Sequence, residues 1–281
     1  MITIGDLNGL RAQVDAWRRG GNVAFVPTMG NLHDGHLSLV RAARALADRV
    51  VVSIFVNPLQ FGAGEDFESY PRTLERDSAM LKGEGTDLLF APPVELIYPK
   101  PQDQQTRVEV PGLSGLLCGA SRPVHFVGVA TVVCKLFNMV QPDVAIFGKK
   151  DFQQLMVIGR MVEDLAMPVR IVGVDTRREP DGLAMSSRNA YLTPEERATA
   201  PILYRVLSGL ADRLHAGSSD YAGLQAQTAA ELDDLGFTTD YISIRRAEDL
   251  LEPSADEGEL VVLVAAYLGK ARLIDNIEVS R

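Results

Sequence analysis

Along residues 1 to 175, short apolar runs alternate with stretches of helical periodicity. Four runs are almost continuously apolar and rich in β-branched residues: Val23–Val26, Val50–Val56, Val144–Phe147 and Val169–Val174. Such runs are typical of parallel strands that are covered on both faces. The remaining pattern predicts a short strand at 87–90 and helices at 6–19, 36–47, 75–82, 131–140 and 151–165.

Strands that alternate with helices predict an α/β fold, a Rossmann-like doubly wound parallel sheet with right-handed crossovers. Ligands bind such sheets beyond the carboxyl ends of the strands. Polar loops follow three of the predicted strands, at 27–35, 57–64 and 148–150. We expect these loops to converge on one pocket.

The pattern changes after about residue 175. Thr193 and Pro194 begin a helical region that continues to about Leu235, with Thr193 as the capping residue. Three strands are then predicted, at 241–244, 260–265 and 271–274. We therefore predict two domains: a Rossmann-like domain at 1–175 and a smaller α+β domain at 176–281.

Composition excludes several classes of protein. The 281 residues are 46% hydrophobic and 23% charged, as in an ordinary globular protein. No run of about 18 apolar residues predicts a membrane span, and the N-terminus lacks the basic and apolar regions of a secretory signal. We expect a cytoplasmic protein without a membrane partner.

The net charge of −9 argues against nucleic acid as the main partner, because a phosphate-backbone binder needs a broad basic surface. A nucleotide needs only a few local cations. Cys118 and Cys134 are the two cysteines, and neither belongs to a CxxC motif. They predict two thiols in a reducing compartment, without a disulfide framework or a zinc site.

The segment His33-Asp34-Gly35-His36 stands where the first crossover helix begins, and neither a P-loop nor a GxGxxG motif is present. A helix N-terminus offers free N–H groups and partial positive charge. Two imidazoles beside it can donate hydrogen bonds to phosphate oxygens. Spacing alone leaves a capping role and a metal site open, although no cysteine or acidic cluster completes the latter.

Further candidate chemistry lies in other loops. Met185-Ser186-Ser187-Arg188 joins two hydroxyls to a guanidinium, which suits a phosphate chain. Lys150, in Gly148-Lys149-Lys150-Asp151, can neutralise charge on a reacting phosphorus. Taken alone, Ser186-Ser187-Arg188 is more typical of a solvated loop, and the lysine segment is also typical of a simple basic turn. Residues 61–69, which carry glycines and acids, predict a mobile surface loop that closes over the site.

Together these segments resemble the pantothenate synthetase family of the HxGH-type nucleotidyltransferase superfamily. The matching stretches are Val26–His36, Val56–Phe61, Tyr70–Leu74, Gly148–Gln154, Asp181–Asn189 and Ala271–Asn276. The resemblance covers essentially the whole chain. It implies the ATP-dependent condensation of pantoate with β-alanine to give pantothenate, AMP and pyrophosphate, through pantoyl adenylate, on the route to coenzyme A.

The resemblance also implies residue roles. His33, His36 and Lys150 would be catalytic, with His36 as proton donor. Gln60 and Gln154 would bind pantoate, and Gln60 would also bind β-alanine. The ATP site would comprise Met29, Gly30, His33, Gly35, His36, Gly148, Lys150, Asp151, Met185, Ser186, Ser187 and Arg188. Mg²⁺ would accompany ATP, with no protein metal site assigned. The C-terminal domain would cover the site, and the protein would form a homodimer.

Two positions depart from the family pattern. Lys149 stands where the family usually has Glu, and Val124 stands where it usually has Gly. Valine cannot adopt the backbone angles that glycine can, so the local geometry is in question. We expect neither change to abolish activity, because the neighbouring Lys150 and His125 are retained.

Two other functions compete with the ligase. A transferase that moves a nucleotide onto a phosphate ester would need a cationic acceptor pocket, whereas this chain has Gln60 and Gln154 at the matching positions. A non-enzymatic nucleotide sensor would have lost its catalytic groups, whereas His33, His36 and Lys150 are present.

Overall fold

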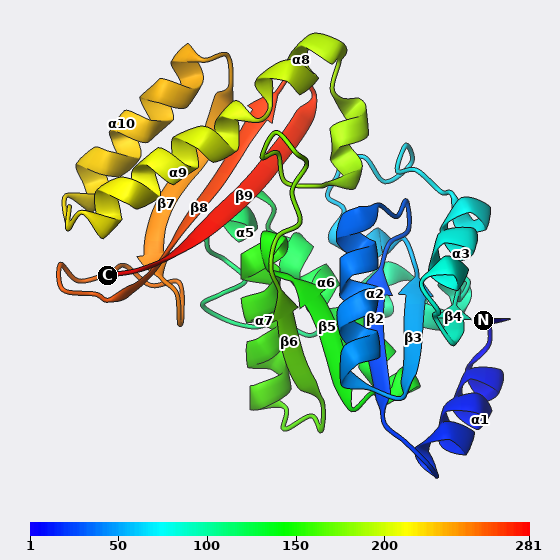
Figure 1. Cartoon of the computed structure of the whole chain (residues 1–281). Helices are drawn as coiled ribbons and strands as arrows, with labels where there is room; N and C mark the ends of the chain where they lie inside the picture. Colours follow the sequence, from blue (N-terminus) through cyan, green and yellow to red (C-terminus); the bar gives the residue numbers. More distant parts are fainter. The chain divides into compact units, whose positions relative to one another are not determined.

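The computed structural model describes residues 1–281 and contains two compact units (Figure 1). The N-terminal unit comprises Met1–Lys149 and Gln154–Asp175. The C-terminal unit comprises Lys150–Gln153 and Thr176–Arg281. None of the helices combines the length and apolar character that a membrane crossing needs.

The N-terminal unit is built on a six-stranded parallel sheet with the order β1-β4-β3-β2-β5-β6. Its strands are β1 (Ile2–Ile4), β2 (Val23–Thr28), β3 (Arg49–Ile54), β4 (Leu88–Phe90), β5 (Val144–Gly148) and β6 (Arg170–Val174). Its helices are α1 (Leu7–Arg18), α2 (Asp34–Leu46), α3 (Leu74–Gly83), α4 (Val94–Ile97), α5 (Cys118–Ser121), α6 (His125–Val140) and α7 (Phe152–Asp164), of which α7 begins in the Lys150–Gln153 segment. The Rossmann-like parallel sheet predicted from the sequence is confirmed.

The central strand β2 is buried on both faces, which explains its unbroken apolar sequence. Ala24 and Val26 share a cluster with Val40 of α2 on one face. Phe25 points to the other face, where its ring lies 6.3 Å from that of Phe137 in α6. Successive strand residues point to opposite faces, so a strand covered by helices on both sides needs apolar residues throughout.

The order of the strands reverses at β2. The chain passes from β2 to β3 on one side, and β5 pairs with the other side of β2. In open α/β sheets, a ligand crevice forms outside the carboxyl ends of the strands at such a reversal. The loops after β2 and β5 begin at this point, and the 3-10 helix Pro58–Gln60 follows β3 beside it.

The C-terminal unit contains an antiparallel sheet of β7 (Thr238–Arg246), β8 (Glu259–Leu268) and β9 (Ala271–Ser280). Helices α8 (Pro194–Thr199), α9 (Ile202–His215) and α10 (Tyr221–Asp234) complete it, and Figure 1 shows α9 and α10 lying along the sheet. Leu203, Leu207, Leu210 and Leu214 form the buried stripe of α9, at the spacing of an amphipathic helix. The predicted α+β character of this part is confirmed.

Several elements differ from the prediction: the short helices α4 and α5 were not expected, and β7 and β9 extend beyond the predicted 241–244 and 271–274. β1 was not anticipated, because three residues are too few to establish a periodic pattern. Helix α6 begins at His125 rather than at Thr131. Gly128 lowers the intrinsic helix propensity of the first turns, and packing overrides that preference.

Candidate active site

The loop after β2 turns sharply before α2. Gly30 has φ +81°, and a Cβ atom there would lie 3.0 Å from Ile54 Cγ2 and 3.2 Å from Asp77 Oδ2. Asn31 follows with φ 51°. Two successive residues in the left-handed region, the first with no room for a side chain, explain why glycine stands at position 30.

The Asp77 carboxylate, from the first turn of α3, holds this loop. The side chain is completely buried. Oδ2 accepts hydrogen bonds from Asn31 N (2.8 Å) and Thr73 Oγ1 (3.0 Å), and Oδ1 accepts one from Leu32 N (3.0 Å). These bonds pair backbone N–H groups that the tight turn would otherwise leave unsatisfied. Asp77 was missed at the sequence level, and it fixes the loop that carries His33.

His33 and His36 form a capping box at the start of α2. His33 Nδ1 accepts a hydrogen bond from Gly35 N (3.2 Å), and His36 Nδ1 accepts one from His33 N (3.3 Å). The two rings lie 4.1 Å apart. Because Nδ1 is an acceptor in both rings, each neutral imidazole carries its proton on Nε2. Capping and phosphate binding, which were alternatives at the sequence level, are therefore compatible.

Gln60 lies at the end of the 3-10 helix that follows β3, and it is 8% exposed. Its Nε2 lies 3.1 Å from Met29 Sδ, so the structure brings together two residues predicted from the loops after β2 and β3. The Gln60 carbonyl accepts hydrogen bonds from His125 Nδ1 (3.0 Å) and Arg122 Nη2 (3.4 Å). Both the side chain and the backbone of Gln60 are thus held.

The loop 61–69 is tied down through Glu65. Arg122 forms a two-pronged ion pair with this carboxylate, with Arg122 Nε 2.8 Å from Glu65 Oε1. Burial alone would raise the pKa of Glu65, but the hydrogen bond and charge of Arg122 outweigh it and hold the pKa below its ordinary value of 4.5. The aromatic rings of Phe61, Phe67 and Tyr70 pack together in the same loop region.

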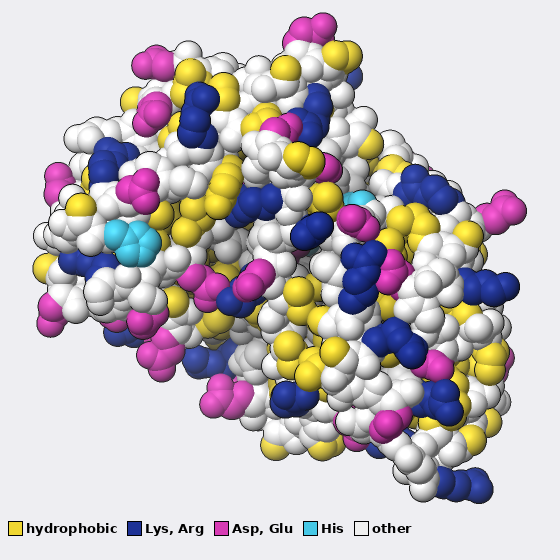
Figure 2. Space-filling view, viewed as in Figure 1, with side chains coloured by type: hydrophobic (Ala, Val, Ile, Leu, Met, Phe, Trp, Pro, Cys, Tyr) yellow, Lys and Arg dark blue, Asp and Glu magenta, His cyan; other side chains and the backbone are white.

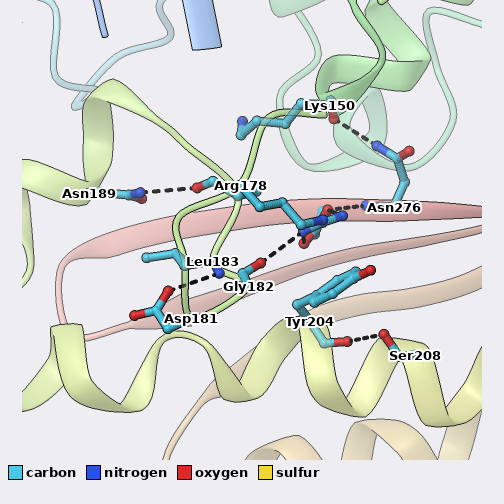
Figure 3. A network of polar contacts seen from close by, with 11 residues as sticks. Lys150, Arg178, Asp181, Gly182, Leu183, Asn189, Tyr204, Ser208 and Asn276 are labelled. Atoms are coloured by element: carbon cyan, nitrogen blue, oxygen red, sulfur yellow. Dashed lines mark hydrogen bonds and ion pairs between the residues drawn. The ribbon is translucent and has the colours of Figure 1, made fainter. Parts of the chain in front are cut away.

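In the C-terminal unit, the backbone of Lys150 is held by strand β9 (Figure 3). Asn276 Nδ2 donates a hydrogen bond to the Lys150 carbonyl at 2.9 Å. The adjacent Asp275 is 3% exposed and forms a bidentate pair with Arg178, at 2.6 and 2.9 Å. Asp275 also accepts a hydrogen bond from Asn276 N (2.8 Å), so the buried ion pair fixes the strand that holds Lys150.

The same arginine fixes the turn before Ser186. Arg178 Nη1 donates to the Gly182 carbonyl at 3.2 Å, and the guanidinium lies 3.6 Å from the centre of the Tyr204 ring (Figure 3). Gly182 has φ +93°, and a Cβ atom there would lie 3.0 Å from Tyr204 Cδ1. Gly182 therefore permits a tight, packed turn.

Ser186 and Lys150 line a common pocket in the C-terminal unit, together with Asp275. Ser186 caps the 3-10 helix Ser187–Tyr191, and its Oγ accepts a hydrogen bond from Arg188 N at 3.3 Å. The backbone N–H of Met185 donates to the Arg177 carbonyl at 3.0 Å. The structure thus brings together, around one pocket, Lys150 and Ser186 of the segment Met185–Arg188, which were predicted separately from the sequence.

The predicted site residues divide between the two units. Those in the N-terminal unit are Met29, Gly30, His33, Gly35, His36, Gln60, Gly148 and Gln154. Those in the C-terminal unit are Lys150, Asp151, Met185, Ser186, Ser187 and Arg188. Asp151 is exposed and Gln154 is half-buried. No group of three or more His, Cys, Asp or Glu residues is arranged to hold a metal ion.

The two departures from the family pattern are accommodated locally. Val124 has φ −92°, an ordinary angle for any residue, and its side chain is exposed. Lys149 Nζ lies 3.1 Å from Asp175 Oδ1, so its charge is paired. Val124 therefore does not strain the backbone, and the extra charge of Lys149 has a partner.

The doubly wound parallel sheet, with polar loops at the point where its strand order reverses, defines an enzyme of the α/β class. The sequence profile described as Pantoate-beta-alanine ligase matches residues 2–278. The chain belongs to the pantoate–β-alanine ligase family, and it catalyses the formation of pantothenate.

The relatives cover the full length of the chain. It is 56% identical to the pantothenate synthetase of Shewanella oneidensis over 282 residues, with 100% of each chain covered. A pantothenate synthetase structure from Thermus thermophilus matches with a TM-score of 0.93 and 52% identity, covering 100% of both chains. The ligase of Francisella tularensis, complexed with beta-gamma ATP and beta-alanine, matches with a TM-score of 0.84 and 33% identity, covering 99% of this chain and 97% of that one.

Replacing Asp77 by Asn should loosen the histidine loop. The amide keeps the size of the side chain but turns one acceptor oxygen into a donor, which then faces an N–H or O–H group. We expect the free energy of unfolding to fall by about 1.5–3 kcal/mol, the range for hydrogen bonds to charged groups, and kcat to fall with it. Denaturant titration and steady-state assays measure both.

Glu75→Gln is the matched control, because it also neutralises a carboxylate in the first turn of α3 but lies at an exposed position. It should change the stability by less than about 0.5 kcal/mol. A normal kcat in the Asp77→Asn variant would show that Asp77 does not position the loop.

The tether between Glu65 and Arg122 should depend on pH. Because the folded pKa of Glu65 lies below its ordinary value, the tether stabilises the loop above pH 4.5 and is lost as the pH falls below 4.5 through the folded pKa. Pepsin cleavage within 61–69 should therefore accelerate below pH 4.5. In Glu65→Gln, cleavage should already be fast above that pH; equal rates in both proteins there would contradict the tether.

Proposed function

We propose that this chain binds ATP at the histidine loop and forms pantothenate in two steps. In the first step, a carboxylate oxygen of pantoate attacks the α-phosphorus of ATP, the bond to the bridging oxygen breaks, and pyrophosphate leaves. In the second step, the β-alanine amine attacks the acyl carbon of pantoyl adenylate and AMP leaves. The observation that carries this proposal is the capping box, which places the imidazoles of both His33 and His36 at the N-terminus of α2.

The histidine pair stabilises the charge on the α-phosphate during the first step. The N-terminus of α2 adds backbone N–H groups and partial positive charge at the same end of the helix. Nucleotidyl transfer depends on positioning and on charge stabilisation more than on covalent help from the protein. His36 serves as the proton donor. Met29, Gly30, Gly35 and Gly148 line the nucleotide site.

Lys150 supplies a full positive charge to the same phosphate. Its side chain is 16% exposed, and Asp151 Oδ2 lies 3.9 Å from its Nζ, beyond hydrogen-bond distance. The ammonium therefore keeps donors for a phosphate oxygen. Ser186, Ser187 and Arg188 bind the β- and γ-phosphates; the pocket shared by Lys150 and Ser186 supports this division of roles.

Gln60 and Gln154 bind pantoate, and Gln60 also contacts β-alanine. The pantoate carboxylate must act as a nucleophile. A neutral amide can orient the acid without the strong ground-state stabilisation that a buried arginine would give. The burial of Gln60 against Met29 supports its role as a fixed contact.

Mg²⁺ accompanies ATP in this proposal. No three His, Cys, Asp or Glu side chains form a metal cluster, and an ion carried mainly by phosphate oxygens and water fits this donor set. When bound, Mg²⁺ neutralises charge on the phosphate chain.

Three further features rest on family resemblance or on loop composition. The protein forms a homodimer. The C-terminal domain covers the nucleotide site. The loop 61–69 closes over the adenylate and shields it from water, and its pairing with Arg122 supports an ordered closed form.

Exchange of labelled pyrophosphate into ATP tests the two-step reaction. If pantoyl adenylate forms first, exchange requires pantoate and proceeds without β-alanine. Exchange at the same rate with and without pantoate would indicate that another molecule accepts the adenylyl group. If the enzyme forms pantothenate but exchanges no labelled pyrophosphate into ATP when β-alanine is left out, the result would argue against adenylate formation as a separate first step.

Lys150→Ala should lower kcat by about 10²- to 10³-fold, the usual loss for one group that stabilises a transition state, while the affinity for ATP changes much less. Lys270→Ala, at an exposed turn between β8 and β9, is the control and should leave kcat unchanged. Steady-state kinetics and calorimetric titration with ATP separate the two effects. An unchanged kcat in Lys150→Ala would remove Lys150 from the mechanism.

A further inference from the structure

A buried chain of hydrogen bonds connects Tyr98, at the end of α4, with the side chain of Gln60. Tyr98 OH lies 2.7 Å from Asn57 Oδ1, and Asn57 Nδ2 lies 2.9 Å from Gln60 Oε1. Tyr98, Asn57 and Gln60 are 6%, 1% and 8% exposed, respectively. A polar chain at this depth is stable only when its donors and acceptors are matched.

Backbone groups determine the orientation of the Asn57 amide. The N–H of Leu59 lies 3.3 Å from Asn57 Oδ1, and the carbonyl of Gly128 lies 3.1 Å from Asn57 Nδ2. A backbone N–H can only donate and a carbonyl can only accept. Asn57 therefore presents its oxygen to Tyr98, and the Tyr98 hydroxyl must be the donor.

The contact with Gly128 depends on the absence of a side chain. A Cβ atom at position 128 would lie 2.4 Å from the Leu59 carbonyl oxygen and 2.6 Å from Gln60 Cα. Only glycine lets α6 approach the 3-10 helix this closely. The same approach brings the Gly128 carbonyl within reach of Asn57.

The hydrogen bonds from Tyr98 through Asn57 to Gln60 determine which group Gln60 can offer to a ligand. Its Oε1 accepts the hydrogen bond from Asn57, so its Nε2 carries the two remaining N–H groups. One faces Met29 Sδ at 3.1 Å, and a thioether is a weak acceptor. Gln60 is thus held as a hydrogen-bond donor, complementary to a carboxylate or hydroxyl oxygen.

We propose that Tyr98 is a positioning residue for pantoate: through Asn57 it locks the Gln60 amide with its N–H groups toward the substrate. This inference rests on the proposed role of Gln60 in binding pantoate. A Gln60 amide free to rotate would present its oxygen part of the time and would repel the pantoate carboxylate.

The surroundings of Tyr98 suit a permanent donor. Burial raises the pKa of its phenol, so the hydroxyl keeps its proton across the working pH range. The ring is packed near Phe55, with centroids 6.1 Å apart, and Lys135 Nζ lies 5.6 Å from its centre. Since the ring is held by these contacts, removal of the hydroxyl alone should leave the packing in place.

Tyr98→Phe tests the proposal. Loss of one buried hydrogen bond should raise the dissociation constant for pantoate about three- to tenfold and lower the Tm by at most a few degrees, with the dissociation constant for ATP nearly unchanged. Tyr221→Phe is the matched control, because it removes a hydroxyl that bonds the Ser254 carbonyl in the C-terminal unit. Calorimetry measures both affinities. Equal weakening of pantoate and ATP binding, or no change in pantoate binding, would overturn the proposal.

A double-mutant cycle with Gln60→Ala shows whether Tyr98 acts through Gln60. If it does, Tyr98→Phe should weaken pantoate binding in the wild-type protein but have no further effect in the Gln60→Ala background. An equal effect in both backgrounds would refute the relay. Unaltered pantoate affinity in Gln60→Ala itself would show instead that the proposed role of Gln60 is wrong, so the two failures are distinguishable.

Discussion

The buried carboxylate of Asp77 is the interaction on which the nucleotide loop depends. The chain leaves β2 and must reverse within a few residues to enter α2, so Gly30 and Asn31 adopt left-handed angles. Such a turn directs backbone N–H groups inward, where water cannot reach them. Because Asp77 accepts those N–H groups, the turn is stable and the histidine pair begins the helix in a defined position.

The same solution recurs at the other loops of the site. The side chain of Asn57 forms hydrogen bonds with backbone groups at the turn after β3. Asn276, held in turn by Asp275, donates a hydrogen bond to the Lys150 carbonyl. In each case a short polar side chain that contacts no substrate in the proposed mechanism holds a loop that does. The reactive groups can therefore sit on loops, yet with the precision of regular secondary structure. The visible surface, by contrast, carries acidic and basic side chains interspersed with one another (Figure 2).

The parallel sheet and the loops that carry the candidate site residues could be predicted from the sequence. Val23–Val26 and Val50–Val56 are apolar without alternation, which few structures other than a covered strand tolerate. His33 and His36 were recognisable from their motif and from the segments that accompany it. Asp77 was not, because it stands in the first turn of a helix beside Glu75, where an acidic residue is ordinary.

Burial distinguishes Asp77 from Glu75, and burial follows from tertiary packing. For the same reason, the partners of Asn276 and Tyr98 could not be predicted from spacing along the chain. The Asn276–Lys150 contact joins residues 126 positions apart, and the Tyr98–Asn57 contact joins residues 41 positions apart. Local propensity carries no information about such pairs.

The segment Lys150–Gln153 packs with the C-terminal unit, although the chain on either side of it belongs to the N-terminal unit. The polypeptide therefore passes between the units three times, and no single cut separates them. A single recombination event between residues 150 and 276 would take Lys150 from one parent protein and Asn276 from the other. The hydrogen bond from the Asn276 side chain to the Lys150 carbonyl would then join residues of different origin. The two units are thus bound to a common evolutionary history, and exchange of either for a homologous module requires joint selection of this four-residue segment and strand β9.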